Sequence, residues 1–103
     1  MVKKPADTKW LVNTPSFKAG YSLNQNGEVF VHLEGGAHDF RLVSYVNKNR
    51  DKFFADLSRV TGEFTAYAVI PSSDTKLNKL AIMAGMIFIK DYHGHKIYYR
   101  MMG

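Results

Sequence analysis

The stretch Ser73–Gly103, SDTKLNKLAIMAGMIFIKDYHGHKIYYRMMG, decides the fold of this chain. In its first part, apolar residues at helical spacing follow Ser72-Ser73-Asp74, which supplies the N-cap candidates. Gly85 stands where helices commonly end, because glycine adopts the left-handed conformation without steric cost. An apolar run at 86–89 and a tyrosine-rich run at 97–102 flank a turn sequence, which predicts two paired strands. The stretch therefore predicts a helix, a glycine stop and a hairpin.

Two further elements are expected directly upstream of this stretch. Residues 64–70 are almost continuously apolar, which is typical of a central strand covered on both faces. Residues 38–59 show apolar side chains every three or four positions, interrupted at 47–52. This pattern predicts one long helix that is kinked or split near Asn49.

The first third of the chain reads as three strands. The segment 24–27 ends in Asn26-Gly27, a strong signal for a type I′ turn joining two antiparallel strands. The expected order is β-β-β-α-β-α-β-β, an α/β protein with a mixed (α+β) sheet and two helices, in which one parallel crossover is flanked by antiparallel hairpins. The three expected strands are 9–13, 16–23 and 28–33.

This layout resembles the central and C-terminal parts of the GNAT acyltransferase superfamily, over roughly residues 16–103. In that superfamily a helix of the type Asn-x-x-Ala…Tyr-x-x-x-Gly-Phe packs against the sheet before a closing hairpin. Asp74 stands here at the Asn position, Ala81 at the Tyr position and Gly85-Met86 at the Gly-Phe position. The resemblance implies a single shortened GNAT-like domain, similar to abbreviated phage-encoded GNAT-like proteins.

The resemblance also implies a site for acetyl-CoA between a strand and a helix. The family's loop, Arg/Gln-x-x-Gly-x-Gly/Ala, holds the pyrophosphate on backbone N–H groups at a helix N-terminus, where anions are favoured. The segment HLEGGA fits as His-x-x-Gly-x-Ala, although its first residue departs from the family pattern and Glu34 adds a negative charge. A Gly-Gly turn that needs no ligand is the alternative. The candidate cofactor-binding residues are His32, Leu33, Glu34, Gly35, Gly36, Ala37 and Asp74.

Catalytic candidates also follow from the resemblance. GNAT enzymes usually deprotonate an amine with a carboxylate or a water relay, and protonate the departing thiolate with a tyrosine. Glu28 is the candidate base, with an outward-facing strand carboxylate as the alternative. Because Ala81 stands at the tyrosine position, Tyr98 is the candidate acid, with Tyr67, Tyr92 and Tyr99 as alternatives. The strand and two helices that form much of the family's acceptor site have no counterpart before the loop.

Composition limits the remaining possibilities. The chain has 103 residues, which predicts one domain at 9–103 behind a mobile basic leader at 1–8, and its net charge is +5. The absence of cysteine fits a reducing compartment, so we expect the cytoplasm. The resemblance to phage-encoded proteins implies the host cytoplasm or the virion. No apolar run approaches the ~20 residues of a membrane span. A shortened fold leaves edges or faces uncovered, so we expect a homodimer. Asp91, His93 and His95 are too few for a closed metal site, and no metal is expected.

Three functions stay open at this point. The first is an acyltransferase that binds acetyl-CoA and transfers acetyl to an amine. The second is a protein of the same fold without turnover that binds a protein partner, as a virion component or a host-directed inhibitor. The third is a basic nucleic-acid-binding module, which the spread of the fourteen Lys and Arg residues makes the weakest.

Overall fold

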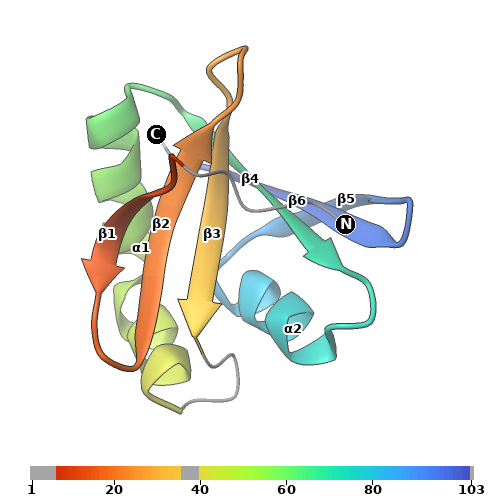
Figure 1. Cartoon of the computed structure of the whole chain (residues 1–103), viewed down its shortest axis with the longest axis horizontal. Helices are drawn as coiled ribbons and strands as arrows, with labels where there is room; N and C mark the ends of the chain where they lie inside the picture. The colour runs from red at the N-terminus through yellow and green to blue at the C-terminus, as the bar shows by residue number, and fades with distance from the viewer. Residues whose placement is uncertain (1–6, 36–39, 103) are drawn as a thin grey trace.

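The computed structural model describes residues 7–35 and 40–102 as one mixed sheet with two helices (Figure 1). The α+β class, the mixed sheet and the two helices predicted from the sequence are confirmed. The predicted order of strands and helices along the chain is also observed. The elements are β1 (Lys9–Asn13), β2 (Phe17–Leu23), β3 (Val29–Gly35), α1 (Phe40–Thr61), β4 (Thr65–Pro71), α2 (Thr75–Met83), β5 (Ile87–Tyr92) and β6 (His95–Met101).

The six strands lie in the order β1-β2-β3-β4-β6-β5. Four of the five neighbouring pairs are antiparallel, and β3 with β4 is the parallel pair. A parallel pair needs a crossover connection, which α1 supplies. β3 and β4 therefore end at the same edge of the sheet, and each is followed by a helix (Figure 1).

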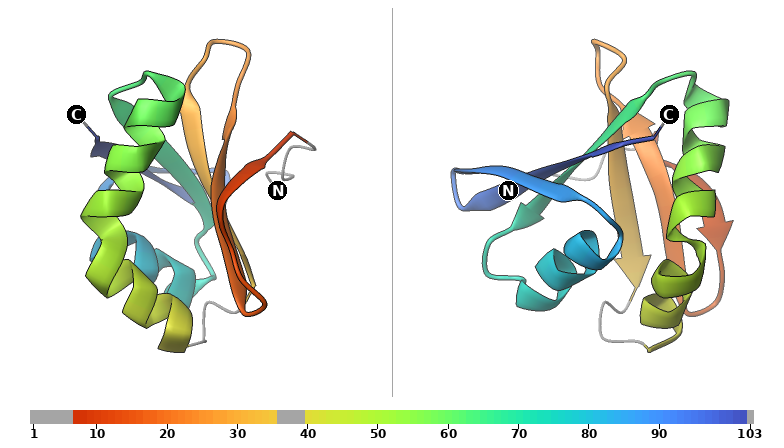
Figure 2. Two further views of the ribbon diagram at one scale, coloured as in Figure 1. Left: turned by 90° about the vertical axis from the view of Figure 1, so that its left-hand side faces the viewer. Right: turned by 180° about the vertical axis from the view of Figure 1, so that it is seen from behind.

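Both helices cover the same face of the sheet, as Figure 2 shows. Side chains alternate along β4: Ala66, Ala68 and Ile70 are buried against the helices, and the residues between them are half-buried. The expectation that this strand is covered on both faces is therefore wrong. Its apolar residues on the other face, Tyr67 and Val69, make the run look continuous although helices cover one side alone.

α1 runs unbroken from Phe40 to Thr61, so the predicted kink or split near Asn49 is wrong. The polar segment 47–52 forms the exposed turns of the helix, apart from the half-buried Asn49. The apolar positions on either side bury Leu42, Val46 and Phe53. An amphipathic helix accommodates such a polar interval when it falls on the solvent side.

Both ends of α2 are fixed in the way that the sequence predicted. Asp74 is the N-cap, and its Oδ1 accepts a hydrogen bond of 3.0 Å from the Leu77 backbone N–H. At the other end Gly85 has φ +84° and donates its N–H to Ile82 O, while Met86 donates to Ala81 O. These two bonds form a Schellman stop, which turns the chain toward β5.

The type I′ turn lies in the other hairpin from the one predicted. A type I′ turn needs positive φ at both central residues. Gly27 has φ +79° but Asn26 does not have a positive value, so the β2–β3 connection is a wider turn closed by Asn24. His93 and Gly94, with φ of 48° and 77°, form the two-residue turn between β5 and β6.

β5 forms one outer edge of the sheet and is exposed at every position. Its large apolar side chains include Ile87 and Phe88, which are 54% and 43% exposed. Such an edge agrees with an incompletely covered sheet, and the expected homodimer stays a prediction. Among the described residues, neither helix has the length and hydropathy needed to cross a membrane.

Candidate functional site

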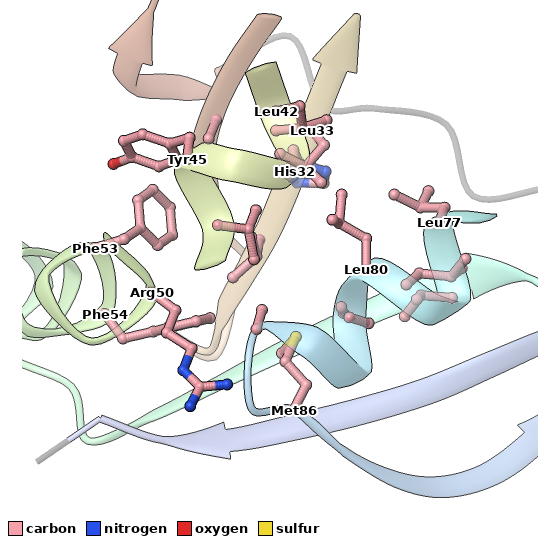
Figure 3. A pocket seen from close by; sticks show the side chains of 18 residues that line it. His32, Leu33, Leu42, Tyr45, Arg50, Phe53, Phe54, Leu77, Leu80 and Met86 are labelled. Atoms are coloured by element: carbon pink, nitrogen blue, oxygen red, sulfur yellow. The ribbon is translucent and has the colours of Figure 1, made fainter. Parts of the chain in front are cut away.

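The parallel strands β3 and β4 separate over a pocket. Their ladder consists of two pairs, Val29 with Ala66 and Phe30 with Tyr67, and beyond these the strands diverge (Figure 1). The pocket lies under this divergence, between the sheet and the two helices, and encloses about 160 Å³ (Figure 3). The remainder of β3 is still paired with β2, and the remainder of β4 with β6.

The walls of the pocket are almost entirely apolar. The sheet contributes small residues, Ala19 and Ala68; α2 contributes Ala81, and its C-cap residue Ala84 also lines the pocket. α1 supplies the larger apolar groups on the opposite side. The main large apolar residues around the pocket are Leu33, Leu42, Val46, Phe53, Phe54, Leu77, Leu80 and Met86. The larger side chains do not reach far enough to fill the space beside these alanines.

Three of the described residues that line the pocket have titratable side chains: His32, Tyr45 and Arg50. His32 Nε2 and Ser22 Oγ are joined by a hydrogen bond of 2.6 Å. Burial raises the pKa of the Tyr45 phenol, so this side chain stays neutral at physiological pH. Arg50 is exposed and donates a hydrogen bond of 2.8 Å to Met83 O at the end of α2.

The predicted cofactor loop is only partly within the described residues. His32 and Leu33 line the pocket, which places the start of the predicted loop beside the divergence of β3 and β4. Glu34 is exposed at the end of β3. Gly36 and Ala37 lie outside the described residues, so the geometry of the loop itself is not part of the site described here.

Gly35, the last residue of β3, has a structural reason to be glycine. Its φ is +108°, a conformation that residues with a side chain rarely adopt. A Cβ atom built at this position would lie 2.7 Å from Ser16 O. Replacing Gly35 would therefore disturb the fold whether or not a ligand binds, and a substitution here is a poor test of cofactor binding.

Glu28 is not brought together with the other predicted site residues. It precedes β3, whereas the predicted loop begins within that strand, because residues 32–35 are the last four of β3; residues 29–31 separate them from Glu28. Its carboxylate Oε1 accepts a hydrogen bond of 2.7 Å from Asn24 within the exposed β2–β3 turn. Glu28 does not line the pocket. Its position supports the alternative reading, a carboxylate of the turn.

Tyr98 and Asp74 belong to a polar network beside the pocket. The Tyr98 hydroxyl donates a hydrogen bond of 2.6 Å to Asn78 Oδ1, and Asn78 Nδ2 donates to Pro71 O and Asp74 O. Tyr98 is buried, and burial raises the pKa of its phenol. The network joins β6, α2 and the end of β4. Asp74 joins the network through its backbone carbonyl, while its side chain caps α2.

Sequence reasoning missed the α1 side of the pocket and the role of Asn78. Leu42, Tyr45 and Val46 follow helical spacing, and a pocket wall has the same spacing as a filled core. The signal that distinguishes them is the alanine content of the facing elements, Ala68 on β4 and Ala81 on α2. That signal becomes visible only when the elements are placed against one another.

The chain matches no protein-family model, and none of the curated proteins matches it. The GNAT resemblance therefore enters below as a proposal.

Proposed function

We propose that this protein is a GNAT-like acyltransferase that binds acetyl-CoA between β3 and β4 and transfers the acetyl group to an amine. The divergence of these two parallel strands over an apolar pocket is the observation that carries the proposal. It combines a strand edge, an apolar cavity and the start of a helix in one place.

The edge of the sheet where β3 and β4 end suits the phosphates of coenzyme A. α1 and α2 both begin at this edge, at Phe40 and Thr75. Helix N-termini carry partial positive charge and backbone N–H groups that point outward, which favours phosphate. The net charge of +5 supports the approach of a polyanion.

The divergence itself suits the extended arm of coenzyme A. On the side of β3, the pairing of β4 ends at Tyr67, while Ala68, Val69 and Ile70 continue along the pocket. Backbone groups at such an edge pair well with an extended chain that carries amide groups, as in β-strand addition. The arm of coenzyme A is of that kind, and it would place the thioester over the apolar pocket.

A second candidate, acyl-CoA binding without turnover, is favoured by one specific observation. Glu28 lies at the far end of β3, and the Tyr98 hydroxyl is already engaged with Asn78. Neither predicted catalytic group stands at the pocket. A protein of this kind would use the site for recognition, and its biological activity would lie in contacts with a protein partner.

Thermal unfolding with and without acetyl-CoA tests the binding step shared by both candidates. Ligand at ~100 times its Kd adds about 2.7 kcal/mol to the free energy of unfolding. For a domain of this size we expect an increase in Tm on the order of 10 °C. ATP at the same concentration is the control, because it carries the nucleotide and phosphates without the arm that enters the divergence.

Release of free CoA thiol in the presence of amine acceptors then separates the two candidates. Thiol release that depends on the acceptor supports the transferase. Binding of acetyl-CoA without release supports the second candidate. An equal Tm increase with ATP and acetyl-CoA would contradict both, because it would reduce the interaction to the attraction of a basic surface for phosphate.

A further inference from the structure

We infer that the pocket accepts an acyl group larger than acetyl, an apolar chain of roughly four to eight carbons; this inference rests on the proposed function. The pocket encloses about 160 Å³. An engineered protein cavity of about 150 Å³ with similar apolar walls binds benzene, a molecule of six carbons. An acetyl group, with two carbons, would leave most of this space empty.

The polar atoms of Tyr45 and Arg50 do not occupy the centre of the pocket, so the interior suits an apolar ligand. In Figure 3 the phenol oxygen of Tyr45 and the guanidinium of Arg50 point away from the centre of the pocket. Among the described residues, no acidic side chain lines it. A buried charge or unpaired hydroxyl on the occupant would therefore be costly, whereas a hydrocarbon chain would not.

The packing around the pocket gives a reason for an occupant of this size. Leu42 and Leu80 are almost completely buried, so the inner wall of the pocket is part of the core. An apolar void in a core lowers the stability of the fold, and a guest that fills it regains the missing contacts. Ala68 and Ala81, small residues in two facing elements, keep the space open.

Affinities for a series of acyl-CoA compounds test the inference directly. We would measure Kd by calorimetry for CoA and for acetyl-, butyryl-, hexanoyl- and octanoyl-CoA. Each buried methylene tightens binding by about fourfold (about 0.8 kcal/mol). We expect the hexanoyl compound to bind on the order of a hundredfold more tightly than the acetyl compound. Equal affinities for the acetyl and hexanoyl compounds would overturn the inference and leave the proposed function standing.

A variant that fills the pocket provides the structural control. Ala81→Leu should remove the preference for long chains while leaving the affinity for CoA itself within about twofold. Ala84→Leu, at a half-buried lining position, serves if the first variant does not fold. Ala55→Leu adds the same side chain on the exposed face of α1 and should leave the series unchanged. A chain-length preference that persists in a folded Leu variant would place the acyl chain elsewhere and overturn the inference.

Hexanoyl-N-acetylcysteamine, a thioester without the nucleotide, distinguishes failure of the inference from failure of the proposed function. If it binds in the wild type and not in Ala81→Leu, while no CoA compound binds, the pocket accepts the acyl chain and the proposed CoA site is wrong. If neither the short thioester nor any CoA compound binds, both are overturned.

Discussion

The two edges of β4 differ in how completely they are paired. On one edge, β6 pairs with β4 along the whole of Thr65–Pro71. On the other edge, β3 pairs with β4 only at Ala66 and Tyr67. Since the strand is the same, the difference comes from the elements beyond it. The edge paired with β6, which we call the closed edge, adjoins a hydrogen-bonded network. The edge that faces β3, which we call the open edge, borders the apolar pocket.

Polar contacts fix the closed edge to both helices. Tyr98 on β6 bonds to Asn78, which in turn bonds to Pro71 O at the end of β4. Arg100, also on β6, donates to Ala84 O and pairs with Asp51 of α1, and its guanidinium lies 4.5 Å from the centre of the Phe54 ring. β6 is thus tied to both helices by polar contacts, whereas the ladder between β3 and β4 stops at Tyr67 and leaves that edge of β4 available for binding.

The largest expected loss of stability comes from a substitution on the closed edge. Tyr98→Ala should lower the free energy of unfolding by about 3–5 kcal/mol, because it removes a buried aromatic ring. Tyr98→Phe should cost about 1–3 kcal/mol, because Asn78 Oδ1 then loses the donor that it has in the wild type. Urea denaturation measures both values.

The same Tyr98→Phe variant tests whether Tyr98 acts only in the polar network or also in catalysis. If Tyr98 acts only within the closed edge, the affinity for acetyl-CoA and any rate of thiol release stay unchanged below the unfolding temperature. A loss of turnover in the folded variant would instead give Tyr98 the predicted role of proton donor.

Local patterns predicted much of the fold. The cap at Asp74 and the stop at Gly85 fix α2 through contacts within a few residues, so sequence reasoning could find them. The coverage of β4 and the continuity of α1 depend on packing between distant segments. The apolar positions of β4 look alike whether or not a helix covers them, and the polar interval 47–52 looks like a break until it is placed on the solvent side.

The candidate site was less predictable, for the same physical reason. His32 and Leu33 came from a local strand-to-helix pattern, and they do line the pocket. Glu28 is predicted as the base from its place on the strand before the loop, but residues 29–31 of β3 lie between the two and Glu28 belongs to the β2–β3 turn. The pocket is an unfilled volume between three elements, and no local pattern records the volume that side chains leave empty.

A pair of glycine substitutions tests how β3, the strand that borders the open edge, is held against β2. Gly35→Ala should cost roughly 1–3 kcal/mol from strain at φ +108°, with a further cost from the contact to Ser16 O. Gly27→Ala is the matched control: φ is +79° there, but its Cβ would meet no atom within 4 Å. Urea denaturation should show Gly35→Ala as the more damaging. Equal costs would mean that the crowding at Ser16 relaxes freely.

Asp74 provides a smaller effect and separates capping from ligand binding. Asp74→Ala should cost about 1 kcal/mol, because the Leu77 N–H loses its acceptor. Asp74→Asn should retain most of that stability, since asparagine is an equally good N-cap. Thermal unfolding measures the stability of both variants and calorimetry their affinity for acetyl-CoA. Loss of affinity in the well-folded Asn variant would show that the carboxylate contributes to the cofactor site, as the sequence predicted.

The smallest effect concerns the acid dependence of the closed edge. The hydrogen bond from Arg100 holds the pKa of Asp51 below its ordinary value of 3.8. A carboxylate whose pKa is lower in the folded state stabilises the fold above its unfolded pKa, and this contribution is lost as the pH falls through the folded pKa. The stability difference between wild type and Asp51→Asn should therefore be present at pH 7 and shrink below about pH 4.

Asp56 is the matched control for that experiment. Hydrogen bonds from Arg59 and Lys52 lower the pKa of its carboxyl in the same direction, so Asp56→Asn should show the same sign of pH dependence. The basic partners of Asp56 are 73% and 75% exposed and its own side chain 35%, whereas Arg100 is 18% and Asp51 83% exposed. Each pair therefore has one well-exposed partner, so 0.5 M NaCl, about 4 Å in Debye length, should reduce the Asp51 and Asp56 contributions alike. A clearly smaller loss at Asp51 would show that the sheltered Arg100 protects its ion pair from salt.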